Sequence, residues 1–171
     1  MPLFPSTEWI ETVARLTTDD AAYRKYGRVD VIAGLKVGER IFRLTFNVFE
    51  IGDVREISAA ELPELDFYIE QTPEQWRAML QSIHENGHAG RDYTLNTLDL
   101  KLEDGLHHNA VEDGYRADKF FRFNESLQRF FDLSATVETT LNPRPWSVTK
   151  VELRAANRLR LRPLRESYGM D

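Results

Sequence analysis

Ile41-Phe42-Arg43-Leu44-Thr45-Phe46-Asn47-Val48 decides the fold, because apolar and polar side chains alternate along it. Side chains of a β-strand point alternately to opposite faces of a sheet, so Phe42, Leu44, Phe46 and Val48 are expected on one face. That face is large, aromatic and apolar. It needs an equally apolar layer to cover it.

The neighbouring segments predict more strands of the same sheet. Residues 29–37 alternate in the same way, and Gly38-Glu39 can form a tight turn into the quoted strand. A second turn is expected at Gly52-Asp53, before a strand over residues 54–57. Three strands should therefore run as an antiparallel meander, and residues 65–69 predict a fourth strand.

Two helices are predicted before and after these strands. The first begins at Ser6 or Thr7 and buries Trp9, Val13 and Leu16, and a short helical segment over residues 19–26 ends at Gly27. Thr72-Pro73-Glu74-Gln75 is a strong helix start, with Thr72 as the cap, Pro73 in the first turn and Gln75 completing a capping box. The apolar stripe of this helix consists of Trp76, Met79, Leu80 and Ile83.

The second half of the chain gives weaker signals. Leucines in residues 95–102 suggest a strand, and His107-His108 are expected in a surface turn between two Glu-Asp-Gly triplets. Asp118 is expected to open an aromatic helix, whose stripe consists of Phe120, Phe123, Leu127 and Phe130, widened by Phe121 and Phe131. Residues 137–141 and 148–153 could form two strands. Arg and Leu alternate over residues 158–162 up to Pro163, which suggests an edge strand or a docking arm.

Length and composition favour one domain. The 171 residues are 42% hydrophobic, and we expect a domain over residues 1–134 followed by an extension over 135–171. The chain has no cysteine, which excludes disulfides, thiolate metal ligands and a cysteine nucleophile and fits a reducing cytoplasm. It contains no apolar run long enough to span a bilayer and no signal-peptide pattern at its start, so we expect a soluble, unprocessed cytoplasmic protein.

Charge is divided unevenly along the chain. From Arg144 onward the chain carries seven basic and three acidic side chains, a net charge of +4, which leaves −10 for residues 1–143 out of the total of −6. This basic arm can contact a protein partner, a second copy or an anionic lipid, or fold back on the acidic body. Nucleic acid is an unfavourable partner, because the body would repel phosphate and the arm offers only Trp146 and Tyr168 for stacking.

The order of the elements resembles the sterol carrier protein family of lipid-transfer domains. The likeness rests on the tryptophan-bearing first helix, a short helix ending in a Tyr-rich segment, and the strand meander with a Gly-Asp-Val turn. It rests also on the strand Leu65-Asp66-Phe67-Tyr68-Ile69 and the helix start Thr72-Pro73-Glu74-Gln75-Trp76. It covers roughly residues 6–133 and is best over 29–83. The residues from 135 onward are extra, and the chain ends in Gly169-Met170-Asp171 instead of the Ser-Lys-Leu ending that some members carry.

The resemblance implies an α+β fold in which helices cover one face of a mostly antiparallel five-stranded sheet, with an apolar cavity between the two layers. The residues alone agree with a small apolar ligand, because burying apolar area needs shape more than polar anchors. The predicted ligand-binding residues face one another across this layer; they are Phe42, Leu44, Phe46, Phe67, Ile69, Trp76, Leu80, Phe120, Phe123 and Phe130.

One sequence pattern indicates metal-dependent catalysis instead of ligand binding. His84-Glu85-Asn86-Gly87-His88 matches the zinc-protease signature, whose two histidines must lie one helical turn apart on one face. Asn86-Gly87 favours a helix end inside the motif, so His84 and His88 are weak metal candidates and no metal is expected. No phosphate-binding loop or dinucleotide fingerprint is present, so no cofactor is expected.

Three functional hypotheses follow. The first is the binding or transfer of a small apolar ligand such as a lipid, fatty acyl chain or sterol. The second is an isomerase-like or cyclase-like enzyme on a cone-shaped α+β scaffold, which requires a titratable group with a shifted pKa deep in the pocket. The third is an accessory subunit of an enzyme acting on a hydrophobic substrate, in which the basic arm contacts the partner.

Overall fold

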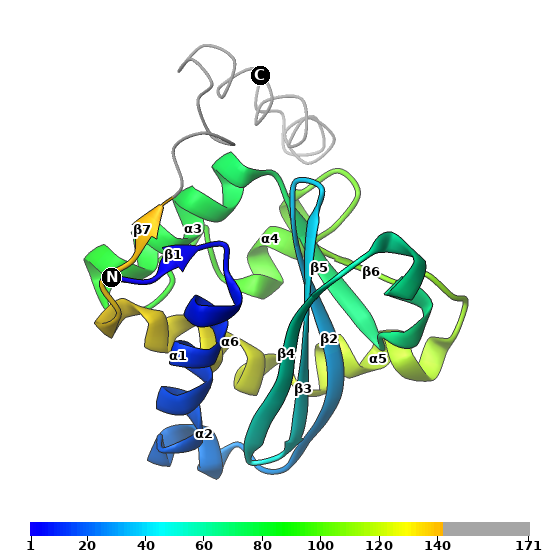
Figure 1. Ribbon diagram of the computed structural model, residues 1–171, viewed down its shortest axis with the longest axis horizontal. Helices are drawn as coiled ribbons and strands as arrows, with labels where there is room; N and C mark the ends of the chain where they lie inside the picture. Colours follow the sequence, from blue (N-terminus) through cyan, green and yellow to red (C-terminus); the bar gives the residue numbers. More distant parts are fainter. Residues whose placement is uncertain (142–171) are drawn as a thin grey trace.

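The computed structural model describes residues 1–141, which form a five-stranded sheet with helices packed on one of its faces and a separate two-stranded sheet (Figure 1). The five strands lie in the order β4-β3-β2-β5-β6. Strand β5 runs parallel to β2, and the other neighbouring strands are antiparallel. The α+β prediction is confirmed, with a sheet that is mixed and not purely antiparallel.

The meander is formed by β2 (Val29–Val37), β3 (Arg40–Val48) and β4 (Glu50–Ile57). Gly38-Glu39 makes the first turn, as predicted, because Val37 pairs with Arg40. The second turn is at Val48-Phe49, and the prediction of a turn at Gly52-Asp53 is wrong. Gly52 and Asp53 instead lie inside β4 beside a bulge, where the left-handed φ of +51° at Asp53 lets the strand accommodate an extra residue.

Local sequence signals define the best-predicted helices. Ser6 caps α1 (Thr7–Thr18) and accepts a hydrogen bond from the backbone N–H of Trp9. Thr72 and Gln75 form the expected capping box of α3 (Pro73–Asn86), which ends at Gly87 with a φ of +78°. The short helix α2 (Ala21–Lys25) is followed by Gly27, whose φ of +102° is the left-handed conformation that the sequence predicts.

The prediction of a strand over residues 95–102 is wrong. These residues form the helix α4 (Leu95–Lys101). The leucines at 95, 98 and 102 are buried and spaced by three and four residues, while Leu100 is 76% exposed. This is helical spacing, and Thr94 caps the helix by accepting from the backbone N–H of Thr97.

The remaining strands and helices complete the packed layer. His107 and His108 form β6 (His107–His108), which pairs with β5 (Phe67–Gln71), so the expected surface turn is wrong. The aromatic helix begins earlier than Asp118, at an Asp113 cap, and is divided at Phe123 into α5 (Gly114–Arg122) and α6 (Asn124–Asp132). The 3₁₀ turn η2 (Leu133–Thr136) then leads to β7 (Thr140–Leu141).

The two ends of the described chain meet. Strand β7 pairs in parallel with β1 (Leu3–Phe4), which places Phe4 opposite Leu141. Of residues 137–141, only Thr140 and Leu141 are a strand, and Val137 belongs to the main apolar core. The predicted strands over 148–153 and 158–162 lie outside the described residues. The proposed division at residue 134 stays a prediction.

The main core lies between the sheet and the helices. Val31, Leu35, Phe42, Leu44 and Phe46 from the sheet are each at most 2% exposed, as their alternation predicts. Val48 differs from that prediction because it lies in the turn and is 40% exposed. Leu16 of α1 is also 37% exposed, so the buried stripe of this helix is formed without it.

The opposite face of the sheet is covered by a 3₁₀ segment, η1 (Ala59–Glu64), and by a smaller apolar cluster of Ile41, Ile57 and Leu65. Gly34 permits this close approach. A Cβ atom at position 34 would lie 2.7 Å from Leu65 Cδ1 and 2.9 Å from Tyr68 Cβ, closer than packed carbon atoms can approach.

Candidate ligand-binding site

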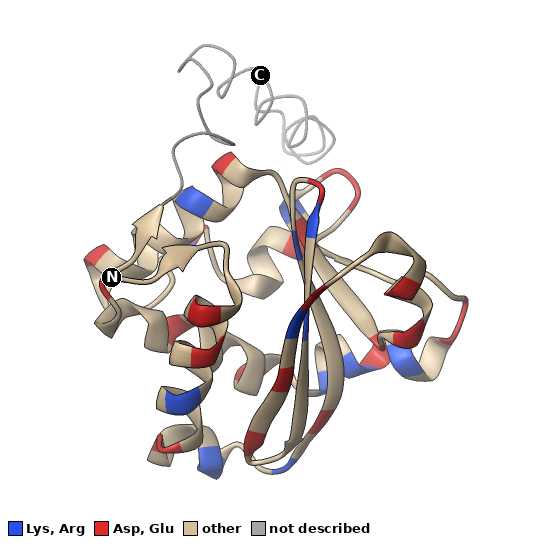
Figure 2. Ribbon diagram, viewed as in Figure 1, with Lys and Arg blue, Asp and Glu red and all other residues tan. Residues whose placement is uncertain are grey.

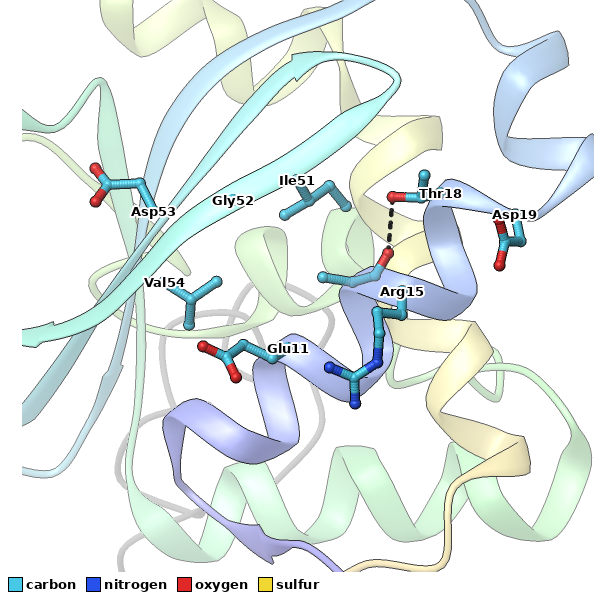
Figure 3. A pocket seen from close by; sticks show the side chains of 9 residues that line it. Glu11, Arg15, Thr18, Asp19, Ile51, Gly52, Asp53 and Val54 are labelled. Carbon is cyan, nitrogen blue, oxygen red and sulfur yellow. Dashed lines mark hydrogen bonds between the residues drawn. The ribbon is translucent and has the colours of Figure 1, made fainter.

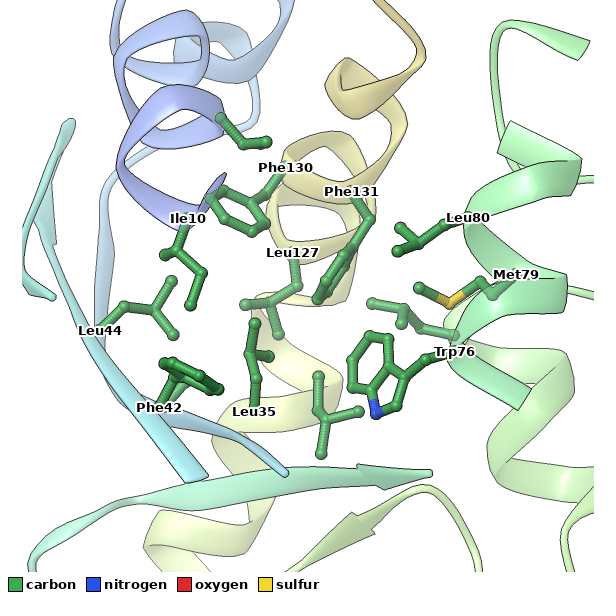
Figure 4. Close-up of a cluster of buried hydrophobic side chains, with 14 of the residues drawn as sticks. Ile10, Leu35, Phe42, Leu44, Trp76, Met79, Leu80, Leu127, Phe130 and Phe131 are labelled. Atoms are coloured by element: carbon green, nitrogen blue, oxygen red, sulfur yellow. The ribbon is translucent and has the colours of Figure 1, made fainter. Parts of the chain in front are cut away.

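The predicted ligand-binding residues come together in one apolar layer. Figure 4 shows part of this layer, with Phe42, Leu44, Trp76, Leu80 and Phe130 among the labelled side chains. All of the predicted residues except Phe123 are buried with at most 6% exposure, and Phe123 is half-buried at the junction of α5 and α6. Their rings contact one another, with centroid distances of 5.8 Å between Phe46 and Phe130 and 5.6 Å between Phe67 and Phe120. These side chains therefore form part of the main apolar core.

A hollow of about 500 Å³ lies at the margin of this layer. It is bounded by α3, η2, β7 and the N-terminal residue, and Leu80 is the predicted ligand-binding residue that lines it. The other lining residues are Met1, Gln81, His84, Glu85, Ser134, Val137, Glu138, Thr139 and Leu141. Leu80 and Val137 also belong to the main core, so the hollow continues the apolar layer outward.

Each wall of the hollow is fixed by a local interaction. Helix α3 presents Leu80, Gln81, His84 and Glu85 along one side, because residues four apart lie on the same face of a helix. The opposite wall is held by the hydrogen bond from the Thr140 backbone N–H to the Pro2 carbonyl, at 3.0 Å. The indole N–H of buried Trp9 also donates to Thr139 Oγ1 at 2.9 Å.

The hollow combines an apolar base with an acidic rim. Met1, Leu80, Val137 and Leu141 supply its apolar side chains. Glu85 and Glu138 are exposed carboxylates among its lining residues, so the mouth favours neutral or cationic groups over anions. His84, the first histidine of the zinc-protease pattern, is also exposed at this site.

The second histidine of that pattern lies beyond the end of α3. Gly87 closes the helix, and His88 Nδ1 is 2.9 Å from the carbonyl oxygen of Ala89. The one-turn spacing that a zinc site needs is therefore not maintained on the helix. Among residues 1–141, no group of three or more histidine or acidic side chains is arranged to hold a metal ion.

One pair of titratable groups resembles catalytic machinery. His107 Nδ1 is 2.8 Å from Asp99 Oδ1, and the imidazole stacks on Phe120 with a centroid distance of 4.3 Å. Burial raises the pKa of Asp99, but hydrogen bonds from His107 and from two backbone N–H groups outweigh it and leave this pKa below its ordinary value. Asp99 and His107 join α4 to β6 and do not line the hollow.

The apolar layer also contains two unpaired polar atoms. Gln71 is 1% exposed and faces the same side of β5 as Phe67 and Ile69; its Oε1 has no hydrogen-bond partner in the described chain, and its Nε2 contacts the sulfur of Met79 at 3.6 Å. The hydroxyl of fully buried Tyr23 likewise has no partner within residues 1–141. Burial raises the pKa of Tyr23 to about 12.

Sequence reasoning missed most of the residues that line the hollow. Leu80 was found because it lies on the stripe of α3. Met1 and Leu141 come from opposite ends of the described chain, and no local pattern shows that these ends pair.

No helix in the described part of the chain is both long and apolar enough to cross a membrane. Comparison of the sequence with protein-family models and with curated proteins, and of the structure with solved structures, gave no match.

Proposed function

We propose that this protein binds a small apolar ligand, such as a lipid or another hydrophobic molecule, in the hollow beside Leu80. The hollow of about 500 Å³ carries the proposal, because it lies within the range of roughly 300–1,000 Å³ typical of small-molecule sites. It also continues the main core through Leu80 and Val137, so an apolar group there would gain contacts on several sides.

The chemistry of the walls supports this ligand class. An apolar chain or ring placed against Met1, Leu80, Val137 and Leu141 would gain about 25 cal/mol for each Å² removed from water. Glu85 and Glu138 at the rim would repel a carboxylate head group. We therefore propose that neutral hydrophobic molecules bind more tightly than fatty acids of the same length. Transfer of the bound ligand from one membrane to another would be a further activity of such a protein.

A fluorescence titration with diphenylhexatriene, an apolar probe that brightens on leaving water, tests the proposal. Gln81→Trp places a bulky ring on an exposed position that lines the hollow, and we expect it to weaken probe binding at least tenfold. Leu100→Trp is the matched control, because Leu100 is 76% exposed on α4 and does not line the hollow. Binding that is not saturable, or equal binding by both variants, would refute the proposed site.

A further inference from the structure

A second groove, about 370 Å³ in volume, lies between α1 and β4 (Figure 3). Ala14 from α1 and Ile51 and Val54 from β4 supply its apolar surface. Figure 3 shows Glu11 and Arg15 on the helix side, with Ile51 and Val54 on the strand facing them. The groove is separate from the hollow beside Leu80, since the two share no lining residue.

Strand β4 is an edge of the sheet. Within residues 1–141 it pairs only with β3, so one side of its backbone has no neighbouring strand. A Cβ atom built at Gly52 would meet no atom within 4 Å, which shows open space over this part of the strand. Exposed edges of this kind can accept an extended segment through backbone hydrogen bonds. The bulge at Asp53 limits regular pairing to the residues on either side of it.

Carboxylates outnumber cations along the rim of the groove, which carries Glu11, Asp19 and Asp53 but only one basic residue, Arg15. Glu11 and Asp19 make no ion pair within the part of the chain that the structure describes. Asp53 points away from α1, and its carboxylate oxygens form ion pairs with the Nε atoms of Arg43 and Arg55, at 3.0 and 3.4 Å. Acidic positions outnumber basic ones along α1 and at its C-terminal end (Figure 2). An occupant with positive charge would therefore be favoured here.

The same chain contains a segment with matching chemistry. Residues 158–162 read Arg-Leu-Arg-Leu-Arg, so an extended conformation would place both leucines on one side and three arginines on the other. Sixteen residues separate Leu141 from Arg158, and they can span up to about 50 Å. The linker starts beside α1, because Trp9 of this helix donates to Thr139, so the segment can reach the groove between α1 and β4.

We propose that residues 158–162 dock in an extended form in the groove between α1 and β4 of the same chain. Leu159 and Leu161 lie against Ile51 and Val54 on the strand side of the groove. The arginines, on the opposite side of the extended segment, face α1 and pair with Glu11 and Asp19. This contact places positive charges of the basic arm beside negative charges of the acidic body. It also covers the exposed edge strand.

Disulfide trapping in the full chain tests the proposal, because the natural sequence has no cysteine. Gly52→Cys combined with Leu161→Cys should form an intramolecular disulfide under mild oxidation at least tenfold faster than Leu100→Cys combined with Leu161→Cys. Leu100 is the control because it is 76% exposed on α4, outside the groove. Adding Glu11→Lys and Asp19→Lys to the first pair should lower its rate to that of the control.

Equal rates for the groove pair and the control pair would overturn the proposal, and so would a rate that charge reversal leaves unchanged. Disulfides formed only between chains would assign the groove to the arm of a second copy and would also overturn docking within one chain. A second measurement avoids introduced cysteines. Replacing Arg158, Arg160 and Arg162 by glutamine should speed hydrogen exchange of the β4 amides at least tenfold, and an unchanged exchange rate would contradict the proposal.

Discussion

Val48 holds an unfavourable backbone conformation. Its φ of +63° is in the left-handed region, which a β-branched residue rarely adopts, and it occupies the first of the two turn positions between β3 and β4. Its side chain is 40% exposed, which is more than that of any of the other apolar residues on its sheet face. The turn therefore forms because the paired strands on either side require it, not because of its own sequence.

Val48→Gly should raise the free energy of unfolding by about 1 kcal/mol, because glycine adopts positive φ without a steric cost. Urea denaturation measures the change. Val54→Gly serves as the comparison, since Val54 lacks a positive φ and packs partly against the core. That variant should be less stable than the natural protein. A less stable Val48→Gly protein would show that the turn is not strained.

The buried hydroxyl of Tyr23 makes stability depend on pH in the alkaline range. Because its pKa is about 12 in the folded protein against 10 in the unfolded chain, the folded state favours the neutral phenol. This contribution is complete below pH 10 and is lost as the pH rises toward 12. Two pKa units correspond to about 2.7 kcal/mol, which sets its upper size.

Tyr23→Phe should remove this dependence. We expect the variant to equal or exceed the natural protein in stability at pH 8, because it deletes a buried polar atom that has no partner in the described chain. Between pH 10 and 12 the variant should lose about 2 kcal/mol less than the natural protein in denaturation experiments. Tyr115→Phe, at a 63% exposed position, should behave like the natural protein. Parallel curves for Tyr23→Phe and the natural protein would contradict the expectation.

Helices α2 and α6 are joined by one ion pair that also caps a helix. Arg129 donates to both carboxylate oxygens of Asp20 at 2.8 Å, while Asp20 caps α2 by accepting from the backbone N–H of Tyr23. The hydrogen bond from Arg129 is the main cause that lowers the pKa of Asp20 below 3.8. Its contribution to stability is therefore present above pH 4 and is lost as the pH falls through the lowered pKa.

Asp20→Asn separates the two roles of this residue. Asparagine can still cap α2 but cannot form the ion pair, so we expect a loss of about 1 kcal/mol at pH 7. Asp20→Ala loses both roles and should cost about 1 kcal/mol more. Denaturation at pH 7 and pH 2.5 checks this, because the difference between the natural protein and Asp20→Asn should shrink in acid. A constant difference would rule out the ion pair as its cause.

The elements that sequence predicted well are those with a local cause. The alternation of β2 and β3 and the capping box of α3 depend on residues close in sequence, and the structure shows both. Helix α4 was misread because Leu100 and Leu102 imitate strand alternation, although Leu95, Leu98 and Leu102 follow the helical period. The β2–β5 pairing and the β1–β7 contact join distant segments, which no local pattern encodes.

The candidate site illustrates the same division. The apolar residues that were expected to bind a ligand do form one cluster, because amphipathic faces must be buried together. The alternation of these residues does not show whether they surround a cavity or form a filled core. Packing depends on the rotamers of residues from six or more elements. The hollow beside Leu80 depends on the ends of the described chain, so only the three-dimensional arrangement reveals it.

Ligand binding at the hollow should stabilise the whole folded chain. A ligand present at 100 times its Kd adds about 2.7 kcal/mol when it binds only the native state. Decan-1-ol should therefore raise the midpoint of thermal unfolding at pH 7. Decanoate should raise it less, because Glu85 and Glu138 repel its carboxylate. Gln81→Trp should abolish the decan-1-ol shift, and equal shifts from the alcohol and the acid would refute an effect of the acidic rim.

The order of the elements along the chain sets the order in which they can pack during translation. Strand β5, which pairs with β2, and helix α6 are both made after the β2–β3–β4 meander. During translation the β2–β3–β4 meander can form soon after residue 57 leaves the ribosome, because its contacts are local. Helix α1 is already made and covers part of this sheet face, but the rest of the face around Phe42, Leu44 and Phe46 remains open to water until Phe130 and Phe131 have been made about 75 residues later. Nascent chains of intermediate length should consequently be strong clients of chaperones and should aggregate when released early.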